Sequence, residues 1–178
     1  DRGDNLRLAV NVSPRQLQAL GFAERVADHL NNNDLTPADL ELEITEGVLM
    51  DDTPAIAINL RLLSEMGVRL SIDDFGTGYS SLGYLQKYPF HTLKIDRTFV
   101  SGLGEQANAA RLIETIIAMA HGLGMDVIAE GVETIEQMAF LKQRACSLAQ
   151  GFLYSKPAGL TDLAESIEAL RRNESLAI

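Results

Sequence analysis

Short runs of β-branched and leucine-rich residues alternate along the chain with longer amphipathic stretches, and this alternation constrains the fold more than any other feature. The short runs predict six strands, and the stretches between them predict helices. When each strand is followed by a helix, neighbouring strands run parallel and are joined by right-handed crossovers. The sequence therefore indicates an α/β fold. The predicted strands are Leu6–Val12, Leu40–Ile44, Val68–Ile72, Thr92–Ile95, Val127–Ala129 and Leu148–Gln150.

Capping residues mark where the predicted helices begin and end. Ser13-Pro14-Arg15-Gln16 combines an N-cap serine, a proline at the first helical position and a capping-box glutamine. From Pro54 to Met66 the apolar residues recur at helical spacing, and Gly67 follows where a C-terminal cap belongs. Further helical segments are predicted from Phe22 to about Leu30, at Thr36-Pro37, around Ser80–Gln86, from about Ala107 to Leu123, from a cap at Thr134 to about Lys142, and after a cap at Thr161.

The length and composition fit one globular domain over residues 1–178, with 46% hydrophobic residues and no linker-like segment. The net charge of −10 disfavours binding to nucleic-acid polymers and to anionic membrane surfaces. The longest apolar runs are far shorter than the roughly 20 residues of a membrane-spanning helix. Cys146 is the only cysteine, so an intrachain disulfide is excluded and a reducing, cytoplasmic location is expected.

A polar residue, usually a charged one, stands at or near the carboxyl end of every predicted strand. An open nucleotide-binding sheet would show one glycine-rich turn, whereas barrel enzymes gather polar groups from all their strands at this end. A barrel is therefore favoured. Glu43, Lys94 and Glu130 each interrupt an apolar stretch, where an unpaired charge would be costly, so we expect them to have partners. The full set of strand-end residues is Asn11, Glu43, Asp73 with Asp74, Lys94, Glu130 and Gln150.

The four carboxylates of this set would repel one another if they were gathered without cations. Oxygen ligands, including the Asn11 amide, suit Mg²⁺ or Mn²⁺ better than Zn²⁺, and the three histidines show no ligand-like spacing. Adjacent aspartates, Asp73 and Asp74, could place one carboxylate between two ions, as in two-metal phosphoryl chemistry. Lys94 could orient an attacking hydroxide and stabilise transition-state charge, or it could form a plain salt bridge with a neighbouring carboxylate.

Six motifs in this order resemble those of the EAL family of bacterial cyclic-di-GMP phosphodiesterases, over essentially the whole chain. They are Asn11-Val12-Ser13-Pro14-Arg15-Gln16, Glu43-Ile44-Thr45-Glu46, Asp73-Asp74-Phe75-Gly76-Thr77-Gly78-Tyr79-Ser80-Ser81-Leu82, Leu93-Lys94-Ile95-Asp96, Glu130-Gly131-Val132-Glu133-Thr134 and Gln150-Gly151-Phe152.

The resemblance implies a (β/α)8 TIM-like barrel that hydrolyses one phosphodiester bond of cyclic di-GMP with two Mg²⁺ or Mn²⁺ ions, giving linear pGpG. It implies catalytic roles for Asp73, Asp74, Lys94 and Glu130, with Lys94 contacting the attacking water. Asn11, Glu43 and Asp73 would ligate one metal, and Asp73, Asp74 and Glu130 the other. Gln150 and Glu133 would bind substrate or support the site. Glu46 would hold the Asp73–Tyr79 loop, which the family links to dimerisation, so a homodimer is expected.

The chain departs from the family pattern in two places. The Glu-Ala-Leu strand, which carries a further metal ligand, is absent, and Ser147 stands where the family usually has aspartate. A complete barrel has eight strands and about 250 residues. We therefore expect an EAL-type domain with about six of eight strands that lacks its N-terminal part. Such a piece should be unstable and weakly active alone, because strand edges would be exposed.

Two alternatives remain open from the sequence. The first is a catalytically inactive EAL module that binds cyclic di-GMP or a protein partner. The second is an enolase-type barrel, in which acidic strand-end residues bind Mg²⁺ and a lysine abstracts a proton. In either EAL case, regulatory or GGDEF-type domains are expected elsewhere in the parent chain, which can itself be membrane-anchored.

Overall fold

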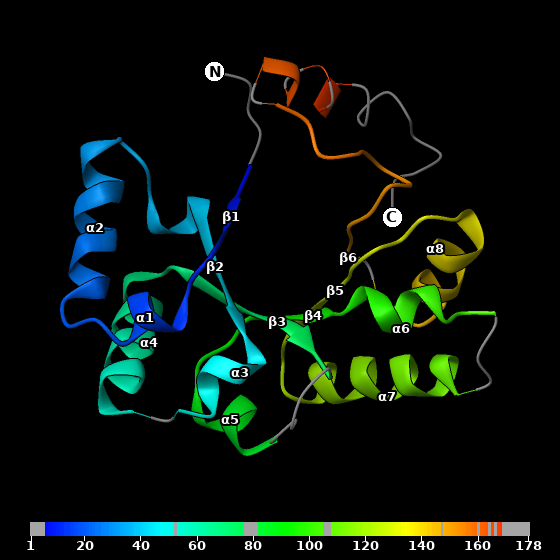
Figure 1. The fold of residues 1–178 in the computed structure, drawn as a ribbon, viewed down its shortest axis with the longest axis horizontal. Helices are drawn as coiled ribbons and strands as arrows, with labels where there is room; N and C mark the ends of the chain where they lie inside the picture. Colours follow the sequence, from blue (N-terminus) through cyan, green and yellow to red (C-terminus); the bar gives the residue numbers. More distant parts are fainter. Residues whose placement is uncertain are drawn as a thin grey trace. The chain divides into compact units, whose positions relative to one another are not determined.

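A computed structural model describes residues 6–51, 53–76, 82–104, 108–146 and 148–159, and near the C-terminus residues 161–163, 165, 167 and 168 (Figure 1). The chain divides into two compact units. The first comprises residues 1–94 with Leu123–Met125, and the second comprises Ile95–Gly122 and residues 126–178. The prediction of one domain over residues 1–178 stays a prediction, and each unit is described by itself.

The first unit is built on a sheet whose strands lie in chain order. β1 (Leu8–Asn11), β2 (Leu40–Thr45), β3 (Arg69–Phe75) and β4 (Thr92–Ile95) follow one another across the sheet. β1 pairs with β2, and β2 with β3, in parallel. Parallel neighbours need a crossover between them, and helices supply it in each case. The predicted α/β class is therefore confirmed.

The two faces of β2 and β3 differ in chemistry because successive strand residues point to opposite faces. Leu42, Ile44, Leu70 and Ile72 are fully or almost fully buried on one face. The opposite face carries a row of polar residues in register, with Glu41 beside Arg69, Glu43 beside Ser71, and Thr45 beside Asp73. A sheet with one apolar face and one polar but buried face is what an enzyme barrel needs, since the apolar face packs on helices and the polar face can line a site.

Two helices of the first unit have the caps that the sequence predicted, α1 (Pro14–Leu17) at its start and α4 (Pro54–Met66) at its end. In α1 the Ser13 side chain accepts a hydrogen bond from the Gln16 backbone, which completes the predicted capping box. The longer helices are α2 (Phe22–Asn32) and α4 (Pro54–Met66), and α4 ends at Gly67, whose φ of 93° is left-handed. α4 contacts α1, α2 and β3, so it forms the centre of the apolar layer (Figure 1). The shorter elements are a 3₁₀ turn η1 (Pro37–Asp39), α3 (Glu46–Leu49) and α5 (Leu82–Lys87).

The second unit contains the parallel pair β5 (Asp126–Ala129) and β6 (Leu148–Ala149). Around it lie α6 (Arg97–Ser101), α7 (Ala109–Gly122) and α8 (Ile135–Lys142), and α6 runs alongside α7 (Figure 1). Thr134 caps the start of α8, as predicted, and it forms a capping box with Gln137. Cys146 is buried, and burial raises the pKa of its thiol to about 11, so it remains a neutral apolar group at physiological pH.

The six predicted strands all occur, with ends that differ by up to three residues. β3 is the largest difference, because it extends through Phe75 and so holds Asp73 and Asp74 within the strand. The short helices α3 and α6 were not predicted, since each is only about one turn long. Residues 77–81, 105–107 and 147, which include parts of the predicted helices and Ser147, lie outside the described residues. Within the described residues, no helix combines the length and apolar character needed to cross a membrane.

Candidate active site

A buried lysine holds two carboxylates together at the polar face of the first unit. The Lys94 ammonium lies 2.7 Å from Glu43 Oε1 and 3.1 Å from Asp73 Oδ1. The three residues come from β4, β2 and β3, and each is at most 9% exposed. Ion pairs this well buried are costly to desolvate and persist only with close geometry. The sequence-based expectation that Glu43 and Lys94 need partners is confirmed, and the partners are each other.

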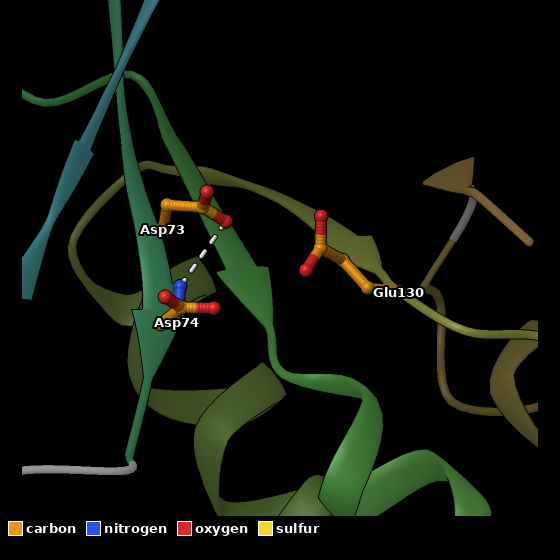
Figure 2. Close-up of side chains that lie close together, drawn as sticks. All are labelled: Asp73, Asp74 and Glu130. Atoms are coloured by element: carbon orange, nitrogen blue, oxygen red, sulfur yellow. Dashed lines mark hydrogen bonds between the residues drawn. The ribbon is translucent and has the colours of Figure 1, made fainter. Parts of the chain in front are cut away.

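Asp74 differs from Asp73 in exposure and in backbone conformation. Its φ is 55°, a left-handed value that aspartate tolerates better than most residues, and its backbone N–H donates to Asp73 Oδ1 at 3.1 Å. Figure 2 shows the two carboxylates side by side at the end of β3 with this hydrogen bond. Asp73 therefore accepts hydrogen bonds from both a backbone amide and an ammonium, while the exposed Asp74 side chain can reach a ligand.

Asn11 is the last residue of β1 and pairs in register with Glu43. The backbone N–H of Val12 donates to the Glu43 carbonyl at 2.9 Å, which extends the pairing one residue beyond the strand. The Asn11 side chain is exposed. Its amide oxygen is thus carried at the same level of the sheet as the Glu43 carboxylate, which suits a neutral ligand beside a charged one.

Glu46 begins α3 directly after β2 and is 8% exposed. Its Oε2 atom accepts a hydrogen bond from the Gly76 backbone N–H at 3.2 Å, and its Oε1 atom has no hydrogen-bond partner within the described residues. Glu46 therefore contacts the first residue after β3. Its predicted role in holding the Asp73–Tyr79 loop stays a prediction, because residues 77–79 lie outside the described residues.

The second unit has a pocket of about 220 Å³ where β5 and β6 end. Glu130 directly follows β5, as Figure 2 shows, and Gln150 directly follows β6. The Glu130 backbone N–H donates to the Ile95 carbonyl at 3.0 Å, which fixes the start of this loop. Three of the predicted site residues, Glu130, Glu133 and Gln150, thus share one pocket, together with Arg97, Gly131, Gly151 and Phe152.

Glycine is required at two positions of this pocket because the backbones approach closely. Gly131 has a φ of 67°, and a Cβ atom there would lie 2.5 Å from Arg97 Cβ. A Cβ atom on Gly151 would overlap the backbone of Val132. Val132 and its neighbours hold this crossing with two hydrogen bonds, from the Val132 N–H to the Gln150 carbonyl and from the Leu153 N–H to the Val132 carbonyl, both 3.0 Å long.

We predict that Gly151→Ala lowers the free energy of unfolding by about 1–3 kcal/mol, because the added methyl group must push the Gln150–Val132 crossing apart. Gly122→Ala is the matched control, since nothing lies within 4 Å of the added Cβ and alanine favours the end of α7. Urea unfolding of both variants measures the difference. Equal stability of the two variants would contradict the close packing at Gly151.

The structure groups the predicted site residues into two sets, one in each unit. Asn11, Glu43, Glu46, Asp73, Asp74 and Lys94 belong to the first, and Glu130, Glu133 and Gln150 to the second. Arg97 and Phe152 also line the pocket of the second set, and neither was given a site role from the sequence, although Phe152 belongs to the Gln150-Gly151-Phe152 motif. A signal for Arg97 was present, because it stands two residues after the strand Thr92–Ile95, as the other candidates stand after theirs.

The EAL domain family model matches residues 1–157. A curated relative, the cyclic di-GMP phosphodiesterase NbdA of Pseudomonas aeruginosa, is 43% identical over 168 residues, which cover 94% of this chain and 22% of NbdA. The chain belongs to the EAL domain family. It spans about a fifth of the length of NbdA and of other curated relatives that it matches.

Solved EAL structures have a fold similar to that of this chain. The PaMucR phosphodiesterase, solved in complex with c-di-GMP, superposes with a TM-score of 0.83 at 42% identity, covering 88% of this chain and 64% of that one. Klebsiella pneumoniae BlrP1, solved with manganese and c-di-GMP, gives a TM-score of 0.79 at 30% identity, covering 85% of this chain and 39% of that one. The predicted EAL-type barrel fold is confirmed.

Proposed function

We propose that this chain contributes the catalytic site of a cyclic di-GMP phosphodiesterase that uses two divalent cations, Mg²⁺ or Mn²⁺. The observation that carries the proposal is the buried Lys94, Glu43 and Asp73 cluster on adjacent strands of an EAL family member. In the reaction, water adds to one phosphorus atom, the bond from that phosphorus to the 3′ oxygen breaks, and linear pGpG results. The net conversion consumes one water molecule.

The donor set fits hard divalent cations. Glu43, Asp73 and Asp74 supply carboxylate oxygens from β2 and β3, and Asn11 supplies an amide oxygen at the same level as Glu43. No sulfur or imidazole ligand belongs to the set, which favours Mg²⁺ or Mn²⁺ over Zn²⁺. We propose that Asn11, Glu43 and Asp73 hold one cation and that Asp73, Asp74 and Glu130 hold the other, with Glu130 included from family membership and its place after β5. Bound cations would lower the pKa of a coordinated water and neutralise phosphate charge.

Other residues of the chain have roles besides metal binding. Lys94 carries a buried positive charge between two carboxylates, so it is held in place and can donate a hydrogen bond to the attacking oxygen or to transition-state charge. Gln150 and Glu133 offer polar contacts in the pocket of the second unit. Phe152, which also lines this pocket and is 58% exposed, offers a flat apolar surface to a purine base. Glu46 positions the backbone after β3 through Gly76.

The proposal is tested by assaying the complete polypeptide with cyclic di-GMP. We expect pGpG to form with Mn²⁺ or Mg²⁺, formation to stop on adding EDTA, and activity to return when the metal is restored. Binding of cyclic di-GMP without any hydrolysis would instead support the inactive EAL module. Turnover of a carboxylate substrate by proton abstraction would support the enolase-type alternative, which the EAL match disfavours.

We further propose that the protein acts in the cytoplasm, as a homodimer, with regulatory or GGDEF-type domains in the same polypeptide. The share of NbdA that this chain covers, 22%, supports the presence of other domains in such relatives. The single cysteine, neutral and buried, suits a reducing compartment. Size-exclusion chromatography with light scattering tests the dimer.

A further inference from the structure

The pocket of the second unit combines acidic residues with one guanidinium. Glu130 and Glu133 line it together with Arg97 and Gln150. In a chain with a net charge of −10, a cation in such a pocket would be expected to pair with a carboxylate. Arg97 does not. No hydrogen bond or ion pair engages its side chain anywhere in the described part of the chain, and the side chain is exposed.

The backbone of Arg97 is nevertheless firmly placed. The preceding Asp96 is buried and caps α6, accepting a hydrogen bond from the Thr98 backbone N–H at 3.0 Å. One residue earlier, the Ile95 carbonyl accepts from the Glu130 N–H. The Arg97 Cβ atom rests against Gly131, at a distance that leaves no room for a side chain there. The stem of the arginine is therefore fixed beside Glu130, and its guanidinium is free to engage a ligand.

We propose that Arg97 binds a phosphate oxygen of the dinucleotide and is a substrate-positioning residue for the reaction. The inference rests on the proposed function, since it assigns a phosphodiester to the same pocket. A guanidinium presents paired N–H donors that match a phosphate in two parallel hydrogen bonds, which an ammonium cannot do. A pocket rich in carboxylates repels a phosphate unless cations face it, and Arg97 supplies a cation that belongs to the protein itself.

Lys94 cannot take this role. Its side chain is 4% exposed and its ammonium already lies between Glu43 and Asp73, so its charge is directed at protein carboxylates. Arg97 has the opposite properties, because its side chain is exposed and has no partner among the residues that the structure describes. Lys94 and Arg97, on either side of the end of β4, therefore have different roles. Lys94 is structural and catalytic, and Arg97 recognises the substrate.

The test measures binding of pGpG, which the reaction does not consume, by calorimetric titration in Mn²⁺. We expect Arg97→Ala to weaken the affinity for pGpG about 10- to 100-fold and Arg97→Lys to weaken it less, because lysine keeps the charge and loses the paired donors. Affinity for guanosine, which carries no phosphate, should change less than twofold. Affinity for Mn²⁺ alone should also be unchanged, which separates loss of phosphate binding from loss of the metal site.

Arg111→Ala is the matched control, since Arg111 is an exposed arginine of the same unit whose side chain has no partner in the described part of the chain and does not line the pocket. It should bind pGpG as the unmodified protein does. An Arg97→Ala variant with unchanged pGpG affinity, or one that loses guanosine equally, would overturn the assignment to phosphate. A protein that fails to hydrolyse cyclic di-GMP would overturn the proposed function, while the pGpG titration would still decide the role of Arg97.

Discussion

Asp73→Asn is expected to lower the rate of Mn²⁺-dependent cyclic di-GMP hydrolysis by about 1,000-fold or more. The amide keeps the shape of the side chain but removes the negative charge that pairs with Lys94 and that the proposal assigns to both cations. Losing a charged ligand in a buried site removes several kcal/mol of transition-state stabilisation, and each 1.36 kcal/mol corresponds to a factor of about 10 in rate. Initial rates of pGpG formation across a Mn²⁺ titration measure the effect.

The matched control for this variant is Glu65→Gln, which removes a carboxylate from the exposed surface of α4 in the same unit. It should hydrolyse cyclic di-GMP at the normal rate. Circular dichroism and urea unfolding establish that the Asp73→Asn protein is folded under assay conditions. Near-normal hydrolysis by the folded Asp73→Asn variant would exclude Asp73 as a metal ligand and would undermine the proposed two-cation site.

Lys94→Met should lower the free energy of unfolding by about 3–5 kcal/mol in chelator, which is the usual cost of removing one partner from a buried charge pair. Methionine fills a similar volume, so the loss reports charge more than packing. It leaves Glu43 and Asp73, at 9% exposure each, without the ammonium that lies 2.7 Å and 3.1 Å from their oxygens. Urea unfolding in EDTA measures the change.

Arg61→Met is the control for this comparison, because Arg61 and Glu65 form an exposed pair on α4 at 3.5 Å. Its loss should cost about 0.5 kcal/mol or less. Adding Mn²⁺ should restore part of the stability of the Lys94→Met variant, because a bound ion stabilises the folded state by mass action and neutralises the charge of the same carboxylates. A Lys94→Met protein as stable as the unmodified one in EDTA would show that the cluster is not held by the ammonium.

Most of the fold could be predicted because its signals are local. The α4 boundaries follow from Pro54 near its start and Gly67 beyond its end, and both are features of the sequence alone. The end of β3 was harder to place, since Asp73 and Asp74 resemble loop residues in composition. Their place in the strand is set by pairing with β2, where Thr45 lies beside Asp73. Local composition does not predict pairing between segments that are distant in the sequence.

The site could be predicted in its residues but not in its contacts. Their positions within apolar stretches identified Glu43 and Lys94 as charges in need of partners, yet only the structure shows that Lys94 joins Glu43 to Asp73. The Glu41 carboxylate was missed altogether. It is buried on the same face of β2 and lies 3.3 Å from Arg7 and 3.7 Å from Arg69, near the opposite end of the strands. Its sequence position before an apolar residue gave no sign of that pairing.

The register between β2 and β3 limits how a family of such sequences can vary in length. A shift of one residue in either strand would exchange the two faces, turning Glu43 toward the helices and Leu42 toward the site. Insertions and deletions within these strands should therefore be rare among relatives. The capped helix α4 between them ends at Gly67, so changes of length can be absorbed in the turns on either side of it, where no ladder is displaced. Length variation in the family is thus expected to concentrate there, and sequence comparison can locate it without any biochemical assay.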